Sequence, residues 1–405
     1  MIVRVSFPKV FYTLYVIIMC MPLYFSSSII DLADNIMLLL GIAFLFLIKY
    51  KPSRFMMFVF IYFVYLILIS FIKDTDAANM YMITSNLKII TFLSVTECFI
   101  QKKPKATMNI FLIVILTFVL MDFISIVCFP EGLYQHTYVW NQWSTTYEAC
   151  WIYGYKNNRI YWYAIMILLV CWRYINTNMH RIVVIAATVL SLTAMILVES
   201  DTSAITVGII AIGILFFLFR SEKHPVNKLQ KKIFNQEMYV VFGIYIILFI
   251  MLIGGMMSFL QPVLTSVFKK DLTFSSRTII WSSVVQLIFQ KPIFGWGIME
   301  SVDVANILGN SAFTSAHNQI LNTIWQGGIV GLILFALIFI ELGRKVNSQP
   351  DKRIRRFLCL MVFSILFVML FESVLRLSTT GATWFWLLLC YYFDKVEMNE
   401  KLTDN

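Results

Sequence analysis

The chain has 405 residues, of which 60% are hydrophobic and 13% are charged, and its net charge is +10. Soluble domains usually contain about half apolar and about a quarter charged residues, so this composition excludes a soluble protein and indicates a polytopic membrane protein. The positive charge does not indicate a nucleic-acid partner, because the basic residues lie mostly in short segments between apolar runs, where they orient membrane proteins.

Apolar stretches predict about twelve membrane-spanning helices in one all-α domain that covers residues 1–405. A helix needs about 20 residues to cross a bilayer, and the second, sixth and last stretches are shorter than this. The stretches run at about 10–25, 35–48, 55–72, 85–100, 107–129, 160–172, 182–198, 204–219, 238–260, 318–340, 357–371 and 381–393.

The basic residues predict the orientation of these helices. With a cytoplasmic N-terminus, 23 of the 32 Lys and Arg residues fall on the inside, as the positive-inside rule requires. Both termini are then cytoplasmic, and two large loops, at about 130–159 and 261–317, are exterior. Because functional residues concentrate on loops, we expect the chemistry at the exterior face.

The first exterior loop is rich in Tyr and Trp. These rings suit the membrane interface, and they also suit stacking on sugars, so both interpretations stay open. The loop region also contains Cys128 and Cys150, the two cysteines able to meet outside, which leaves a disulfide open. No CxxC pair occurs, and this argues against a zinc site.

Candidate functional residues gather between positions 271 and 331, where Arg277 and His317 lie. A helical pattern resumes after His317 with Asn318, Asn322 and Gln326 four residues apart, on one helix face. Polar side chains are costly in a bilayer unless they face a cavity or a partner. We therefore assign these three amides to substrate binding.

The same stretch resembles the O-antigen ligase and polymerase family, the Wzy and WaaL type of membrane glycosyltransferases. The resemblance lies in RTIIW at 277–281, KPIFGWG at 291–297, AHN at 316–318 and QGGIVG at 326–331, with a weaker match in GYKNNRIYWYA at 154–164. The family's usual Ser-Arg before the eighth helix is missing, because the sequence there reads ESDTSAIT.

The resemblance implies a glycosyltransferase C-like fold and an enzyme of the bacterial cytoplasmic membrane. Such an enzyme moves a glycan from undecaprenyl diphosphate to an acceptor sugar at the outer face, without a metal or other cofactor. We predict a Wzy-type polymerase that extends a lipid-linked repeat unit of O-antigen, capsule or exopolysaccharide. A flippase and a chain-length regulator are its expected partners.

Two alternatives remain open. The first is a ligase that transfers the glycan to lipid A core. The second is a flippase or another transporter, which usually has ionisable residues deep within its spans; here the deep apolar runs are nearly free of charge apart from Asp122.

The leaving group of this reaction is a lipid diphosphate, which needs positive charge and hydrogen-bond donors more than a proton. The fork of Arg277 can hold two phosphate oxygens, so Arg277 is our candidate for the diphosphate contact. Arg159, Lys88 and Arg376, near exterior ends of spans, are supporting candidates for substrate binding. Each of these four residues has the alternative interpretation of an anchor in the headgroup layer.

The acceptor hydroxyl needs a general base, and histidine, with an unperturbed pKa of about 6.5, suits this role. His317 is our candidate, because His180 and His224 are predicted on the cytoplasmic side and His136 lies in the aromatic loop. A helix N-terminus at His317 also favours the neutral imidazole. The alternative is a structural histidine.

Asp74 and Asp76 are the candidates for a metal site, because they form the DxD pair that often holds a divalent ion in nucleotide-sugar transferases. The pair follows the third span beside Lys73 with no sugar-nucleotide fold around it, which favours a solvated turn. We therefore predict no metal. The exterior carboxylates Glu148, Glu300 and Asp303 receive no role from the sequence.

Overall fold

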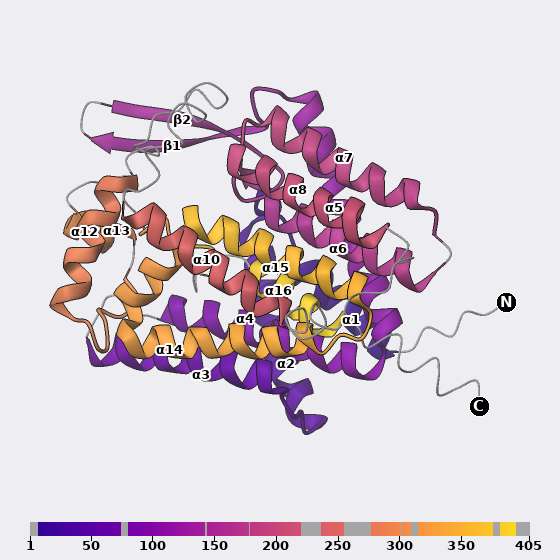
Figure 1. The fold of residues 1–405 in the computed structure, drawn as a ribbon, viewed down its shortest axis with the longest axis horizontal. Helices are drawn as coiled ribbons and strands as arrows, with labels where there is room; N and C mark the ends of the chain where they lie inside the picture. The colour runs from indigo at the N-terminus through magenta and orange to yellow at the C-terminus, as the bar shows by residue number, and fades with distance from the viewer. Residues whose placement is uncertain are drawn as a thin grey trace.

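The computed structural model describes residues 7–73, 80–141, 144–177, 179–219, 236–254, 277–299, 301–308, 315–375 and 381–393. In this part of the chain the fold is a bundle of α-helices with one small β-sheet (Figure 1). The predicted all-α membrane fold is confirmed at the level of these elements.

Seven helices within the described ranges are long and apolar enough to cross a membrane. They are α2 (Ser28–Leu47), α3 (Arg54–Ile72), α4 (Met80–Lys102), α5 (Pro104–Cys128), α8 (Asp201–Gly213) with its π-helical continuation (Ile214–Leu218), α14 (Gln319–Asn347) and α15 (Lys352–Phe371). Five shorter apolar helices accompany them: α1 (Phe7–Met19), α6 (Ile160–Asn176), α7 (Arg181–Leu197), α10 (Glu237–Ile253) and α16 (Ala382–Tyr392). Each of these twelve apolar helices overlaps one of the stretches predicted from the sequence.

Of the stretches that look short in the sequence, the second is lengthened in the structure and the last is not. The second becomes a full 20-residue helix, because Ser27 caps α2 and its first turns include Asp31 and Asp34. The last stays short, since α16 has 11 residues, all of them buried. A helix that is apolar all round packs inside a bundle.

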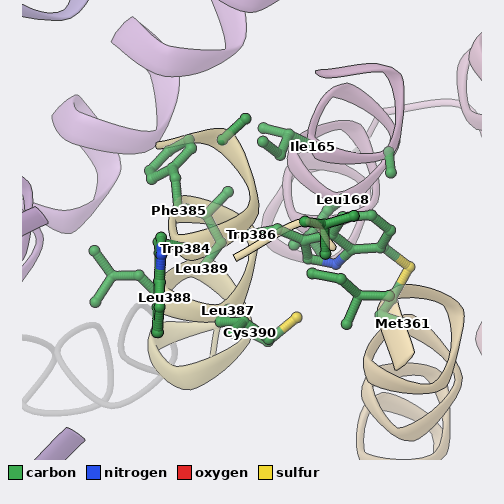
Figure 2. Packing of buried hydrophobic residues seen from close by; sticks show 14 of the residues in the cluster. Ile165, Leu168, Met361, Trp384, Phe385, Trp386, Leu387, Leu388, Leu389 and Cys390 are labelled. Atoms are coloured by element: carbon green, nitrogen blue, oxygen red, sulfur yellow. The ribbon is translucent and has the colours of Figure 1, made fainter. Parts of the chain in front are cut away.

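Helix α16 forms the centre of the core. Trp384 contacts Tyr62 and Phe63 of α3, and the Phe385 ring lies 4.1 Å from the Phe111 ring of α5, centroid to centroid. Figure 2 shows Trp386 extending from α16 toward Leu168 of α6 and Met361 of α15. Lipid tails are as apolar as these side chains, so close packing holds such a helix in place.

The two predicted exterior loops contain structure that the sequence did not predict. The first forms an antiparallel sheet of β1 (Tyr134–Asn141), β2 (Ser144–Trp151) and β3 (Gly154–Tyr155), in that order. The second contains α12 (Arg277–Gln290) and α13 (Ser301–Leu308). Both lie toward the same end of the bundle (Figure 1). Cys128 and Cys150 form no disulfide.

Helix α14 is interrupted at Gly328, whose φ of 61° and ψ of −161° are not helical. The turn at 291–297 fills the break with backbone hydrogen bonds. Trp296 N donates to Trp325 O and Gly297 N to Gln326 O, each at 2.9 Å. Ile329 N donates to Pro292 O at 2.9 Å, and Val330 N to Ile293 O at 3.3 Å. Non-helical backbone at membrane depth must be completed by protein in this way.

Helix α3 closes the same junction from the other side. The Tyr65 hydroxyl donates to Gly327 O at 2.7 Å, and Ile298 N donates to Ser70 Oγ at 2.9 Å. Gly295, with a φ of 72°, faces Gln326 and Gly328 so closely that a side chain would overlap their backbone. The two glycine-containing motifs therefore pack against each other and fix α12 relative to α14.

Candidate active site

Four segments that are distant in sequence meet around the carboxylate of Glu372. This residue follows α15, while Asn157 precedes α6, Arg277 begins α12 and His317 precedes α14. Glu372 Oε1 accepts from Arg277 Nη2 at 2.7 Å and from Asn157 Nδ2 at 3.1 Å. Glu372 Oε2 lies 3.1 Å from His317 Nδ1. The structure thus joins the two catalytic candidates, Arg277 and His317, through one carboxylate.

These side chains are only partly exposed: 18% for Arg277 and for Glu372, and 27% for His317. A half-buried ion pair is screened by salt less than a surface pair. Hydrogen bonds between ionised groups are also stronger than neutral ones. The pair of Arg277 and Glu372 is therefore stronger than a surface ion pair, and part of each side chain in the cluster stays exposed.

Helix α12 approaches the cluster with two residues of one face. Arg277 and Trp281 are four positions apart, a spacing that places both on the same side of a helix. Arg277 contacts Glu372, while the buried Trp281 Nε1 donates to Ala316 O at 3.1 Å, directly before His317. This explains why Arg and Trp occur together in RTIIW.

His317 has a positive φ of 45°. Non-glycine residues rarely adopt this conformation, and where they do the strain often belongs to a functional site. His317 N donates to Ser315 Oγ at 3.3 Å, which supports the turn.

Asn318 ties the start of α14 to the end of α15. Its Oδ1 caps α14 by accepting from Leu321 N, and its Nδ2 donates to Leu370 O, each at 3.0 Å. Ser373 Oγ donates to Asn318 O at 3.4 Å. The amide that the sequence assigned to substrate thus holds His317 next to Glu372.

A chain of polar groups extends the cluster to the start of α8. Ser200 Oγ lies 2.9 Å from Asn157 Oδ1 and 2.6 Å from Ser203 Oγ. Because Asn157 Oδ1 only accepts, Ser200 donates its single proton there and accepts the proton of Ser203. These serines belong to ESDTSAIT, the segment in which the family's usual Ser-Arg is missing.

Arg159 lies outside the cluster and is fully buried. Its Nε is 3.2 Å from Asp122 Oδ2, and its Nη2 donates to Gly154 O at 3.1 Å. Tyr163 and Tyr153 complete the shell of Asp122: the Tyr163 hydroxyl donates to Oδ2 at 3.0 Å and Tyr153 N to Oδ1 at 2.9 Å. A buried charge requires such partners. Arg159 fixes the segment that carries Asn157.

The remaining substrate-binding candidates are dispersed. Lys88 of α4 pairs with Asp34 of α2 at 3.0 Å. Asn322 is buried one turn into α14, and Gln326 contributes its carbonyl to the junction with Gly297. Arg376 lies outside the described residues.

The described part of the chain holds no group of three His, Cys, Asp or Glu residues able to bind a metal ion. Asp74 and Asp76 lie outside this part, as does Glu300, so the structure does not describe the DxD pair.

Sequence reasoning missed Glu372, Asn157 and Ser200. Glu372 is an ionisable residue at the predicted exterior end of a span, like Arg277, but this position alone does not distinguish it from an interfacial residue. Asn157 stood within GYKNNRIYWYA. The sequence around Glu372 and Asn157 does not show which residues they contact, because those residues come from distant segments.

A family model described as O-antigen ligase matches residues 186–336. This range runs from α7 into α14 and contains Arg277, Trp281 and His317. This range of the chain is similar to the O-antigen ligase family. The match does not distinguish the Wzy-type polymerases within this family, and it ends before Glu372.

One relative of known name is the ComP-specific O-oligosaccharyltransferase of Acinetobacter baylyi. The two are 30% identical over an alignment of 118 positions, which covers 26% of this chain and 21% of the relative. The alignment therefore spans about a fifth of the relative's length.

Proposed function

We propose that this protein transfers a glycan from undecaprenyl diphosphate to an acceptor hydroxyl, with His317 as the general base. The contact between Glu372 Oε2 and His317 Nδ1 carries the proposal. A carboxylate at one ring nitrogen holds the proton there and orients the ring. Nε2 then keeps its lone pair, and it is this nitrogen that accepts the proton of the acceptor hydroxyl.

The step is a displacement at the anomeric carbon of the donor sugar. The acceptor oxygen gives its proton to His317 Nε2 and forms the new glycosidic bond, while the bond from the anomeric carbon to the diphosphate oxygen breaks. Undecaprenyl diphosphate departs as an anion without needing a proton. The imidazolium formed on His317 is stabilised by Glu372.

Arg277 is the group that we assign to the diphosphate. Its contact with Glu372 engages one terminal nitrogen of a side chain that carries five N–H donors. Positive charge at this position stabilises the developing negative charge of the leaving group. Arg277 and His317 flank the same carboxylate, so leaving-group stabilisation and proton transfer act close together.

We further propose that the acceptor is a second lipid-linked repeat unit, which makes the protein a polysaccharide polymerase at the exterior face of the bacterial inner membrane. The departure at ESDTSAIT from the family's Ser-Arg supports this choice. A ligase is the second candidate, favoured by the description of the matching family model and by the transferase name of the relative.

The deciding experiment reconstitutes the purified protein in liposomes with the undecaprenyl diphosphate-linked unit as the sole glycan. A polymerase lengthens the glycan under these conditions, whereas a ligase consumes the donor only after lipid A core is added. Absence of transfer to either acceptor would refute the proposed activity.

His317→Ala is the matching variant. General-base catalysis typically contributes about a hundredfold to ten-thousandfold, so the transfer rate should fall by this factor. Donor binding and membrane abundance should persist, because Arg277 is assigned to the diphosphate. His224→Ala, at a position predicted on the opposite side, is the control. Full activity of His317→Ala, or its loss from the membrane, would contradict the assignment.

A further inference from the structure

A cavity of about 530 Å³ lies at the end of the bundle opposite Glu372. Helices α6, α8 and α15 connect the two ends. Asn157 and Ser200 stand at the cluster ends of α6 and α8, and Glu372 at that of α15, while the opposite ends of these helices meet at the cavity. We call this cavity the basic pocket. Its lining includes Tyr174, Thr177, His180, Arg181, Leu218 and Arg353.

The pocket brings together basic groups from two helices. Arg181 begins α7, and Arg353 lies in the first turn of α15. The described lining residues include no Asp or Glu. Arg353 also pairs with a carboxylate beside the pocket, since its Nη2 lies 2.9 Å from Asp351 Oδ2. Two guanidinium groups and no carboxylate among the described lining residues make the wall of the pocket positive.

Asp351 is already committed to the protein. Its Oδ1 accepts from the backbone N–H groups of Arg353 at 2.8 Å and Ile354 at 3.4 Å, which caps α15. Burial raises the pKa of Asp351, but the hydrogen bonds from Arg353 outweigh burial and lower this pKa below its ordinary value. The carboxylate is therefore ionised at neutral pH, and it cannot by itself neutralise both arginines.

His180 presents a further donor. Its Nδ1 accepts from Ile182 N at 3.4 Å at the start of α7. A ring nitrogen that accepts carries no proton, so the proton of the neutral ring is on Nε2, which is a donor. The pocket is thus lined by donors from His180, Arg181 and Arg353, with the hydroxyls of Tyr174 and Thr177 near them.

The remaining walls are apolar, made by Ile175, Met179, Leu218 and Ile354. A positive site with apolar walls at the ends of membrane helices fits a phosphate ester that carries an apolar part. Basic pockets between helices on the cytoplasmic side suit anionic lipid headgroups, and the charge pattern predicts this end as cytoplasmic. The positive-inside rule accounts for basic residues near helix ends but not for their convergence on one cavity.

We propose that the basic pocket binds a phosphate ester anion, the headgroup phosphate of an anionic phospholipid or a soluble phosphate. Arg181 and Arg353 hold the phosphate from two sides. Bound in this way, the anion bridges α7 and α15 and strengthens the contact of the α6–α7 pair with the rest of the bundle.

The test uses the purified full-length protein with three probes: phosphatidylglycerol, zwitterionic phosphatidylcholine and inorganic phosphate. Native mass spectrometry counts retained lipid, and thermal unfolding measures stabilisation. The variant is Arg181→Gln with Arg353→Gln. The control is Lys51→Gln with Arg54→Gln, which removes the same charge from exposed positions at the start of α3.

We expect the wild type and the control to retain phosphatidylglycerol in preference to phosphatidylcholine, and the pocket variant to bind it at least about tenfold more weakly, since hydrogen bonds to charged groups are the strong ones. Stabilisation by inorganic phosphate in the wild type but not in the pocket variant would assign the site to a soluble phosphate. Stabilisation by phosphatidylglycerol alone would assign it to the lipid.

Equal lipid binding by the wild type and the pocket variant would overturn the proposal. If the double variant does not fold, the wild type alone still tests the proposal. A wild type that shows no preference for phosphatidylglycerol over phosphatidylcholine and no stabilisation by phosphate would also overturn the proposal. Glycan transfer is not measured in this test, so its outcome is separate from that of the proposed activity.

Discussion

Gly328→Ala is expected to disrupt the junction between α14 and the turn at 291–297. A Cβ atom at position 328 would lie 2.2 Å from Ile293 O and 2.6 Å from Phe294 N, far inside van der Waals contact. The φ of 61° and ψ of −161° belong to a region that is essentially restricted to glycine. The turn must therefore move away, or α14 must change its path.

The energetic cost follows from the contacts. The backbone conformation alone costs of order 1–3 kcal/mol for a residue with a side chain. Displacing the turn also weakens the hydrogen bonds that Trp296, Gly297, Ile329 and Val330 donate across the junction, each contributing about 1 kcal/mol. Losing half of them brings the total to about 3–5 kcal/mol.

Thermal unfolding in detergent and membrane abundance measure this effect. The matched control is Gly331→Ala in the same helix, where the added Cβ would meet Thr323 O and the Tyr65 ring at 3.5 Å, an ordinary contact. Alanine in a helix is favoured over glycine by roughly 0.5–1 kcal/mol, so the control should be neutral or slightly stabilised. Gly328→Ala with the unfolding temperature of the wild type would refute the packing of the turn into α14.

Three further substitutions test the cluster, each measured at equal amounts of folded protein. Arg277→Lys should lose most glycan transfer although the charge remains, because an ammonium cannot make a two-point phosphate contact; near-normal product length on gels from Arg277→Ala would remove the residue from the site. Glu372→Gln should lower the transfer rate by about tenfold to a hundredfold, the loss typical when the carboxylate partner of a metal-binding histidine is removed, and the exposed Glu131→Gln is its control. Asn157→Ala should reduce kcat by roughly fivefold with KM for the donor little changed, because it removes a hydrogen bond to Glu372 of about 1 kcal/mol; a changed KM with constant kcat would place Asn157 on the substrate instead.

The helices were predictable because each must satisfy its own backbone in lipid with about 20 mostly apolar residues. This local requirement is visible in any apolar run. The β-sheet was not predicted, since Tyr, Thr, Val and Trp favour strands and Tyr and Trp equally favour the membrane interface. The composition of 130–159 therefore did not decide between a hairpin and an interfacial loop.

Arg159 illustrates a role that local position does not determine. It precedes α6 at a predicted exterior end, which suggested a substrate contact. The sequence also showed Asp122 as a charge within a deep apolar run, and a charge there pairs with a partner. Considering the two together points to the buried pair that the structure contains.

Glu372 was not found because its partners are distant in sequence. It is 55 positions from His317 and 95 positions from Arg277. The residues next to Glu372 in the sequence do not distinguish a functional carboxylate from one that only lies at the membrane interface. The path of α14 and α15 brings it to the histidine, and the contacts of Asn318 hold the two helices in that relation.

The motifs that resemble the O-antigen ligase and polymerase family are of two kinds: some supply side chains to the cluster, and the others position the helices that carry these side chains. RTIIW and AHN supply Arg277, Trp281 and His317 to the cluster, whereas KPIFGWG and QGGIVG join α12 to the break in α14. Trp296 Nε1 donates to Leu287 O at 2.9 Å, so the turn is fixed to α12 as well as to α14.

Arg277 begins α12 and the turn at 291–297 follows its end, so movement of the turn would shift the Arg277 guanidinium relative to Glu372. Catalytic groups act only when held within a fraction of an ångström of their working geometry. A Gly328 variant that still folds should therefore lose transfer, although Gly328 contributes no side chain to the cluster.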